Sequence, residues 1–96
     1  MARDSVRVKI RLPHALLRDW KVAPELDVEG RTLAEAFADL NARVPGLAGT
    51  VLDDQGRVRR FVLVFVNKQA VTHLDPGDVK LSSGDIVHVL PHVAGG

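Results

Sequence analysis

The chain has 96 residues, a length that suits one domain and not two. Hydrophobic residues make up 46% of it and charged residues 26%, and the net charge is +1 with both signs interspersed, so it lacks the basic excess typical of proteins that bind nucleic acids or membrane surfaces. Cysteine is absent, which excludes disulfides, thiolate metal sites and a cysteine nucleophile. No apolar run is long enough for a signal peptide or a membrane span, so we expect a cytoplasmic protein.

The N-terminal part of the chain predicts two strands separated by a loop. Residues 6–12 alternate between apolar and basic side chains, which is the period of a half-buried strand. Residues 14–21 have no such period and are interpreted as a loop. Residues 26–28 predict a short second strand, which Gly30 closes.

The next segment predicts a helix with a defined start. Thr32 and Glu35 fit a capping box, in which the Thr32 hydroxyl accepts a backbone N–H of the first turn and stabilises the helix by about 1 kcal/mol. Pro45-Gly46 stops the helix. A further helical turn within 47–52 and a tight turn at 53–56 follow. The apolar residues that share one helical face are Leu33, Ala36, Phe37, Leu40 and Val44.

The strongest strand signal covers residues 59–66, whose two faces are both apolar, so we predict a central strand there. The remaining segments are predicted as a turn, a short strand, two further turns and a last strand, at residues 67–69, 70–72, 75–78, 82–85 and 86–90.

The two apolar faces of the predicted central strand are expected to contact different parts of the molecule. We expect the valines at positions 62, 64 and 66 to face the helix. An apolar sheet face without a helix suggests a partner-binding surface. The alternative is that the 14–21 loop covers it with Leu16, Leu17 and Trp20, and the sequence does not decide between the two. The residues expected on this second face are Phe61, Leu63, Phe65, His88 and Leu90.

The order of elements is strand, strand, helix, strand, short strand, strand. One helix of about three turns can cover one face of a mixed sheet of four or five strands, which is the β-grasp (ubiquitin-like) arrangement of the α+β class. We therefore predict a single β-grasp domain over residues 1–90 and an extended tail over residues 91–96.

The last third of the chain carries a specific pattern. A Gly84-Asp85 turn precedes an apolar strand, Pro91 and a terminal Gly95-Gly96, and this order resembles the C-terminus of the MoaD/ThiS family of ubiquitin-like sulfur carriers. Upstream, Arg60-Phe61-Val62 and Val66-Asn67 are similar to the family's central strand and the turn after it.

Residues 90–96 are most similar to the CysO-type carriers of cysteine biosynthesis within that family. The small subunits of molybdopterin synthase tend to have an aromatic residue and two prolines before the same ending. His92 stands where a second proline would be, and this departure leaves the pathway open.

The resemblance implies a carrier and not an enzyme. An E1-like activating enzyme of the MoeB/ThiF type would use ATP to adenylate the Gly96 carboxylate, which would then become a thiocarboxylate. The sulfur would pass to an acceptor enzyme such as a cysteine synthase, with molybdopterin, thiamin and secondary-metabolite pathways as alternatives. The chain itself would bind no cofactor, and we expect a monomer.

The tail has the physical properties that such chemistry requires. A carboxylate is a poor electrophile until adenylation supplies a phosphate-type leaving group, so the chain end has to enter the nucleotide site of another protein. Residues 91–96 span about 20 Å when extended. Gly95 and Gly96 lack a Cβ, so we expect them to pass a narrow channel, inside which Val93 and Ala94 would add small apolar contacts.

Two other functions fit the same tail. The chain could be a protein modifier that forms an isopeptide bond through Gly96, or a β-grasp binding module whose tail is idle. Arg57, Arg59 and Arg60 could steer an acidic activating enzyme, but such a cluster is more often a solvated strand end, and we favour that interpretation. His88 and His92 do not have metal-ligand spacing on a strand, so we expect no metal site.

Overall fold

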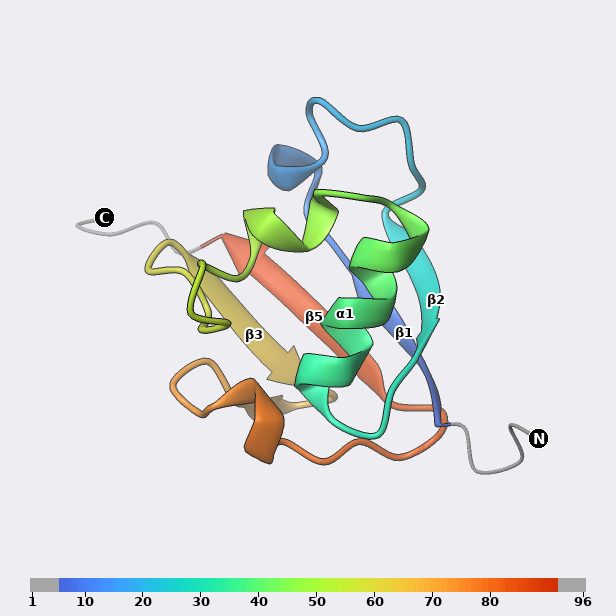
Figure 1. Ribbon diagram of the computed structural model, residues 1–96, viewed down its shortest axis with the longest axis vertical. Coiled ribbons are helices and arrows are strands. Elements are labelled where there is room, and N and C mark those ends of the chain that lie inside the picture. The colour runs from blue at the N-terminus through green and yellow to red at the C-terminus, as the bar shows by residue number, and fades with distance from the viewer. Residues whose placement is uncertain (1–5, 92–96) are drawn as a thin grey trace.

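The computed structural model describes residues 6–91, and the fold below refers to them (Figure 1). They form a β-grasp domain in which one α-helix packs on a five-stranded mixed sheet, as predicted. The strands are β1 (Arg7–Arg11), β2 (Glu25–Glu29), β3 (Val62–Val66), β4 (Gln69–Ala70) and β5 (Ile86–Pro91). The helices are α1 (Leu33–Arg43) and the 3-10 turns η1 (His14–Leu16), η2 (Leu47–Thr50) and η3 (Pro76–Asp78).

The last strand of the chain lies in the middle of the sheet. The strand order is β2-β1-β5-β3-β4, with β5 parallel to β1 and antiparallel to β3. The hairpin β1–β2 forms one side and the hairpin β3–β4 the other, so β5 joins two locally formed hairpins. Because β5 is flanked on both edges, the point where the chain leaves the domain is fixed by two neighbouring strands.

Helix α1 begins where the sequence predicts. The Thr32 hydroxyl accepts the N–H of Glu35 at 3.1 Å, which satisfies one of the free amides at the helix start. The Glu35 carboxylate accepts the N–H of Arg31 at 2.8 Å, one residue before its usual target in a capping box. At the other end, Asn41 Oδ1 accepts the N–H of Gly46, whose left-handed φ of 91° turns the chain out of the helix.

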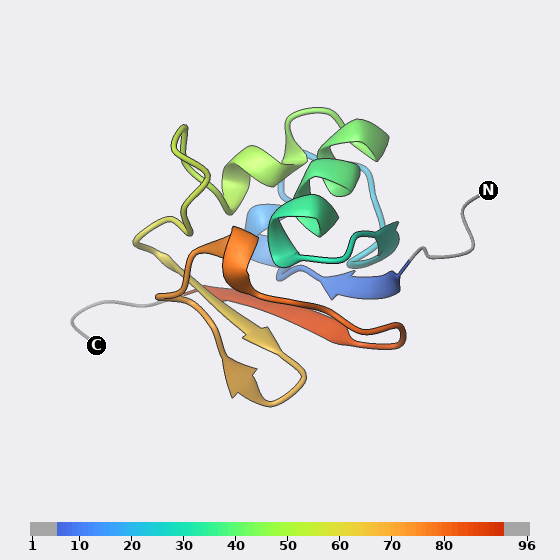
Figure 2. The same ribbon diagram turned by 60° about the horizontal axis from the view of Figure 1, so that its bottom comes forward.

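The core lies between α1 and one face of the sheet. Figure 2 shows α1 and the 3-10 turns on one side, while the opposite side of the sheet carries no other element of residues 6–91. The largest fully buried side chains include Phe37 and Leu40 of α1, Ile10 of β1 and Val64 of β3. None of the described residues is a buried polar or charged residue, so the core is held by apolar packing.

All five strands have boundaries that differ from the prediction, β1 and β2 by one residue at each end. β3 begins at Val62 and not at residue 59, because the N–H of Arg59 bonds to the carbonyl of Val51 and the N–H of Val62 bonds to the carbonyl of Arg59, which closes a turn. β4 covers Gln69–Ala70 in place of 70–72. β5 extends to Pro91, which pairs with Val62, so this proline belongs to the sheet and not to the predicted tail.

None of the helices within residues 6–91 is both long and apolar enough to cross a membrane.

Candidate functional site

Gly96, the predicted site of sulfur attachment, lies outside the described residues. The predicted channel-binding residues lie outside them as well: Val93, Ala94 and Gly95. The structure does describe the residue from which the tail starts. Pro91 is exposed at the end of the central strand β5, and its register partner is Val62 at the start of β3. The tail therefore starts from a point that backbone pairing holds in place.

The face of the sheet opposite α1 is apolar over β3 and β5. Leu63 of β3 pairs with Leu90 of β5, and Phe65 pairs with His88, so the predicted adjacency of these four residues is confirmed. Three of them are half-buried, and Leu90 is 44% exposed. Their role in partner binding stays a prediction.

Phe61 does not lie on this strand face, in contrast to the prediction. It belongs to the turn before β3 and is 66% exposed, the largest exposed fraction among the large hydrophobic residues that the structure describes as exposed. The sequence pattern predicted a strand there because Arg59 to Val66 is apolar apart from its first two residues. The tertiary hydrogen bond from Arg59 to Val51 delays the start of the strand to Val62.

The same sheet face is charged over β1 and β2. The basic residues of β1 alternate with its core residues and pair with acids on β2: Arg7 with Glu29 at 3.3 Å, Lys9 with Glu25 at 3.6 Å and Arg11 with Glu25 at 2.7 Å. These pairs are exposed and add little stability, but they neutralise the charge of this half of the face. The open face thus has an apolar half and a charge-balanced half.

The 14–21 loop does not cover the open face, so this alternative is wrong. Leu17 is buried in the core that α1 covers, and Leu16 and Trp20 pack against that core. The Trp20 ring lies against Gly46 at the end of α1, where an added Cβ would come within 3.0 Å of it. The loop therefore packs on the helix side, because its apolar side chains are drawn into the main core.

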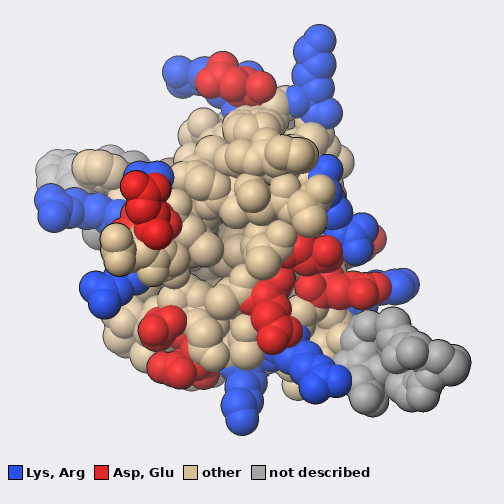
Figure 3. All heavy atoms as spheres, viewed as in Figure 1, with Lys and Arg blue, Asp and Glu red and all other residues tan. Residues whose placement is uncertain are grey.

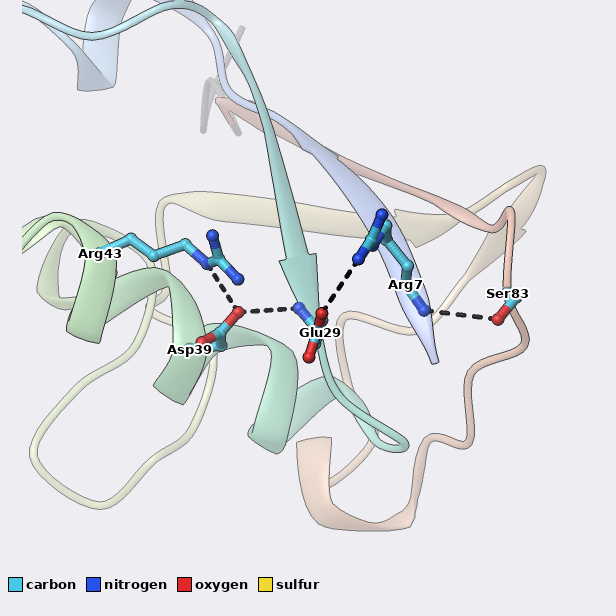
Figure 4. Close-up of polar contacts among 5 residues, drawn as sticks. All are labelled: Arg7, Glu29, Asp39, Arg43 and Ser83. Atoms are coloured by element: carbon cyan, nitrogen blue, oxygen red, sulfur yellow. Dashed lines mark hydrogen bonds and ion pairs between the residues drawn. The ribbon is translucent and has the colours of Figure 1, made fainter. Parts of the chain in front are cut away.

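The edge strand β2 is tied to α1 by a carboxylate that the sequence reasoning missed (Figure 4). Asp39 Oδ2 accepts the N–H of Glu29 and the Nε–H of Arg43, both at 2.8 Å. The Glu29 N–H, helped by the Arg43 guanidinium, holds the pKa of Asp39 below its ordinary value. The Asp39 side chain thus binds a backbone N–H of the edge strand β2 with which a strand of another molecule could otherwise pair. The spacing of Asp39 and Arg43 could have predicted the ion pair within the helix, but nothing in the sequence indicates the contact with β2.

A second polar contact fixes the start of β5. Asn67 has a left-handed φ of 55°, and its amide donates to Asp85 at 3.0 Å while its Oδ1 accepts the N–H of Ile86 at 3.0 Å. Asp85 also accepts the N–H of Ser82 at 2.8 Å. The sequence identified both segments as turns but not their pairing. This contact sets the register of β5, and so the height at which the tail leaves the sheet.

The three arginines before β3 lie at exposed positions. Arg59 donates its Nε–H to the carbonyl of Gly49 at 2.7 Å, whereas Arg57 and Arg60 form no ion pair within residues 6–91. Asp53 accepts the N–H groups of Arg57 and Gln55, and these bonds hold its pKa below its ordinary value.

On the helix side, Asp and Glu side chains gather near α1 and β2, and Lys and Arg side chains stand around the outline of that side (Figure 3). No group of three or more His, Asp or Glu residues within 6–91 is arranged to hold a metal ion.

The known proteins that the chain resembles are small carriers and modifiers. Residues 16–96 match the ThiS family. The chain is 42% identical to small archaeal modifier protein 3 of Haloferax volcanii over 65 residues, which covers 68% of this chain and 70% of that protein. It is 29% identical to the sulfur carrier protein CysO of Mycobacterium tuberculosis over 93 residues, which covers 95% of this chain and all of that protein. A crystal structure of the BexX/CysO complex of Amycolatopsis orientalis contains a chain that superposes with a TM-score of 0.79 at 26% identity, over 93% of this chain and 99% of that one.

Proposed function

The chain belongs to the ThiS family, and from that premise we propose that it is a sulfur carrier whose Gly96 carboxylate is adenylated and then converted to a thiocarboxylate. One observation carries the proposal. A sequence that ends in Gly95-Gly96 leaves the domain from Pro91, at the end of the central strand, beside an uncovered apolar face.

The proposed reaction takes place on the chain end and needs no catalytic side chain of this protein. The carboxylate oxygen attacks the α-phosphorus of ATP, an acyl adenylate forms, and pyrophosphate leaves. Sulfide then attacks the acyl carbon, the new C–S bond forms, and AMP leaves with the electron pair of the broken C–O bond. The domain contributes the position of the tail and a surface by which an enzyme can recognise it.

The activating enzyme is proposed to be an E1-like protein of the MoeB/ThiF type, which supplies the ATP site. It would bind the apolar half of the open face, formed by Leu63, Phe65, His88 and Leu90, because this surface is apolar and carries no covering element. The CysO of Amycolatopsis orientalis, which has the same fold, was crystallised with BexX, so a relative of this chain does bind a partner protein.

The sulfur acceptor is proposed to be an enzyme of cysteine biosynthesis such as a cysteine synthase. The match to CysO along almost the whole chain supports this choice. Carriers for molybdopterin, thiamin or secondary metabolites would have the same fold and ending, so they are the alternatives within this class.

A protein modifier is the second candidate, and one observation favours it. The relative with 42% identity is a small archaeal modifier protein. A modifier would share the adenylation step but would transfer its Gly96 acyl group to a lysine amine and form an isopeptide bond.

Intact-mass spectrometry after co-expression with the activating enzyme distinguishes the two functions. A carrier gains the mass difference between sulfur and oxygen, and the modified atom maps to Gly96. A modifier instead forms conjugates of higher mass whose branched peptides contain Gly95-Gly96 on a lysine. A chain whose mass stays unchanged with an active enzyme, ATP and a sulfur source would contradict both functions and favour a binding module with an idle tail.

A further inference from the structure

The turn that precedes β3 lies beside the start of the tail. We define the tail-root turn as residues 59–61. It leads directly into Val62, which pairs with Pro91, the last described residue before the tail. Paired strands lie about 4.8 Å apart, so a protein that encloses the chain just after Pro91 also contacts the tail-root turn.

The tail-root turn presents an aromatic ring to solvent at this position. Phe61 is 66% exposed and Leu90 is 44% exposed, and they are two of the three large hydrophobic residues classed as exposed within residues 6–91. The third, Leu74, follows β4. A phenylalanine this exposed adds little to folding, and its ring is accessible to another molecule.

Arg60 of the tail-root turn carries a positive charge that has no ion-pair partner within residues 6–91. The basic residues of β1 and the C-terminal Arg43 of α1 all have carboxylate partners. Arg60 has no ion pair or hydrogen bond within residues 6–91. The Arg59 side chain donates to the carbonyl of Gly49, and its charge adds to the backbone hydrogen bonds that lower the pKa of Asp53, so the free charge of the turn is that of Arg60. Aromatic residues and arginine are both enriched in protein interfaces, and Arg60 and Phe61 are neighbours in this turn, so we treat the charge and the ring as one binding element.

We infer that the tail-root turn is a second contact for the activating enzyme, in which Phe61 enters an apolar pocket and Arg60 pairs with carboxylates beside the entrance of the channel that takes the tail. The inference rests on the proposed function and extends it. The apolar half of the open face binds the body of the carrier, and the tail-root turn aligns the tail with the channel. An enzyme with such an acidic entrance would select carriers that have a cation and an aromatic ring at this position.

The test measures steady-state pyrophosphate release by the MoeB/ThiF-type activating enzyme of the same organism, with the full chain as varied substrate. We expect Phe61→Ser and Arg60→Glu each to raise the KM for the carrier about tenfold with kcat unchanged, because they remove binding that is equal in the ground and transition states. Phe61→Leu and Arg60→Lys should recover most of the loss, since they restore apolar area and charge.

Lys68→Glu is the matched control, because it reverses a charge at the opposite end of β3, in the turn between β3 and β4. If the affinity for the enzyme depends on local contacts and not on the overall charge, the KM of this variant should stay within about twofold of the parent value. Thermal unfolding of every variant should match the parent, because the altered side chains are exposed.

The outcomes separate the inference from the function on which it rests. If the parent chain is activated but both tail-root variants keep the parent KM, the inference is wrong and the sulfur-carrier proposal stands. If Phe61→Ser changes self-association and not KM, the turn contacts a second copy and the inference is again wrong. If the parent chain releases no pyrophosphate with an enzyme that is active on another carrier, the proposed function fails first.

Discussion

Gly30 is the residue where the smallest side chain is required by packing and not by backbone conformation. It follows β2, and a Cβ built on it would lie 2.4 Å from the backbone nitrogen of Ala36 and 2.7 Å from the carbonyl carbon of Glu35. The added Cβ would meet the backbone of α1 and not a side chain, so no side-chain rotation can relieve the clash. The sequence predicts only that Gly30 closes a strand, since the approach of the helix is a tertiary feature.

We therefore expect Gly30→Ala to lower the free energy of unfolding by about 1–3 kcal/mol, the usual cost of forcing extra volume into a packed site. Urea unfolding followed by circular dichroism measures the change. Gly49→Ala is the control, because no atom lies within 4 Å of its added Cβ. Equal midpoints for the two variants would show that α1 can move away from β2 without cost.

Asp39 should make stability depend on pH in the acid range. Its pKa is lower in the folded protein than its ordinary 3.8, mainly because it accepts the Glu29 N–H and then because of Arg43. The folded state therefore binds fewer protons than the unfolded state. The resulting stabilisation is present above the unfolded pKa and is lost as the pH falls through the folded pKa.

Asp39→Asn keeps an acceptor for the Glu29 N–H and removes the charge. We expect a lower melting temperature than the parent at about pH 7, and a smaller drop between about pH 7 and about pH 2.5. Asp53, whose pKa is also lowered, titrates in both proteins and leaves the comparison unaffected. A drop as large in the variant as in the parent would mean that other carboxylates account for the acid sensitivity.

At the scale of the elements, the open face of the sheet has two halves with different expected roles. On β3, Leu63 pairs with Leu90 in the apolar half, and on β1, Lys9 pairs with Glu25 in the charge-balanced half. Both Leu63 and Lys9 are half-buried, so their replacement tests surfaces of similar accessibility.

We expect Leu63→Ser to weaken binding to the activating enzyme by about tenfold and Lys9→Ser to weaken it by less than about twofold, because apolar contacts anchor interfaces while exposed ion pairs contribute little. Isothermal titration with the enzyme measures both. An equal loss of affinity for the two variants would mean that the enzyme contacts the whole face and that the division into halves has no role in binding.

At the scale of the whole molecule, the body of the domain and its chain end should have separable tasks. The buried hydrophobic residues of the core lie between Val8 and Val89, and the described residues end at Pro91. If the tail stands clear of this core, as the sequence predicts, its changes should affect activation and not folding.

We expect deletion of Gly96, or Gly95→Phe, to abolish formation of the acyl adenylate and to leave the melting temperature within about 1 °C of the parent. ATP–pyrophosphate exchange and a thermal scan on the same samples measure the two effects. A tail variant that remains a full substrate would contradict the carrier and the modifier functions together. One that melts several degrees lower would contradict the predicted free tail.

The sequence by itself determined the local features of this protein. The period of two in residues 6–12, the Thr32 cap and the glycine turns each depend on neighbours a few residues apart, and they yielded the element order and hence the β-grasp fold. The terminal Gly95-Gly96 pointed to the same family that comparison supports.

Only the tertiary structure decided the features that depend on contacts between distant residues. The bond from Arg59 to Val51 delays the start of β3 and leaves Phe61 in an exposed turn before it. The contact of Trp20 with Gly46 draws the 14–21 loop to the helix side. The bond from Glu29 to Asp39 likewise joins an edge strand to a helix. The physical reason is that a periodic pattern shows which side chains should be buried, whereas the identity of the covering element depends on where the rest of the chain packs.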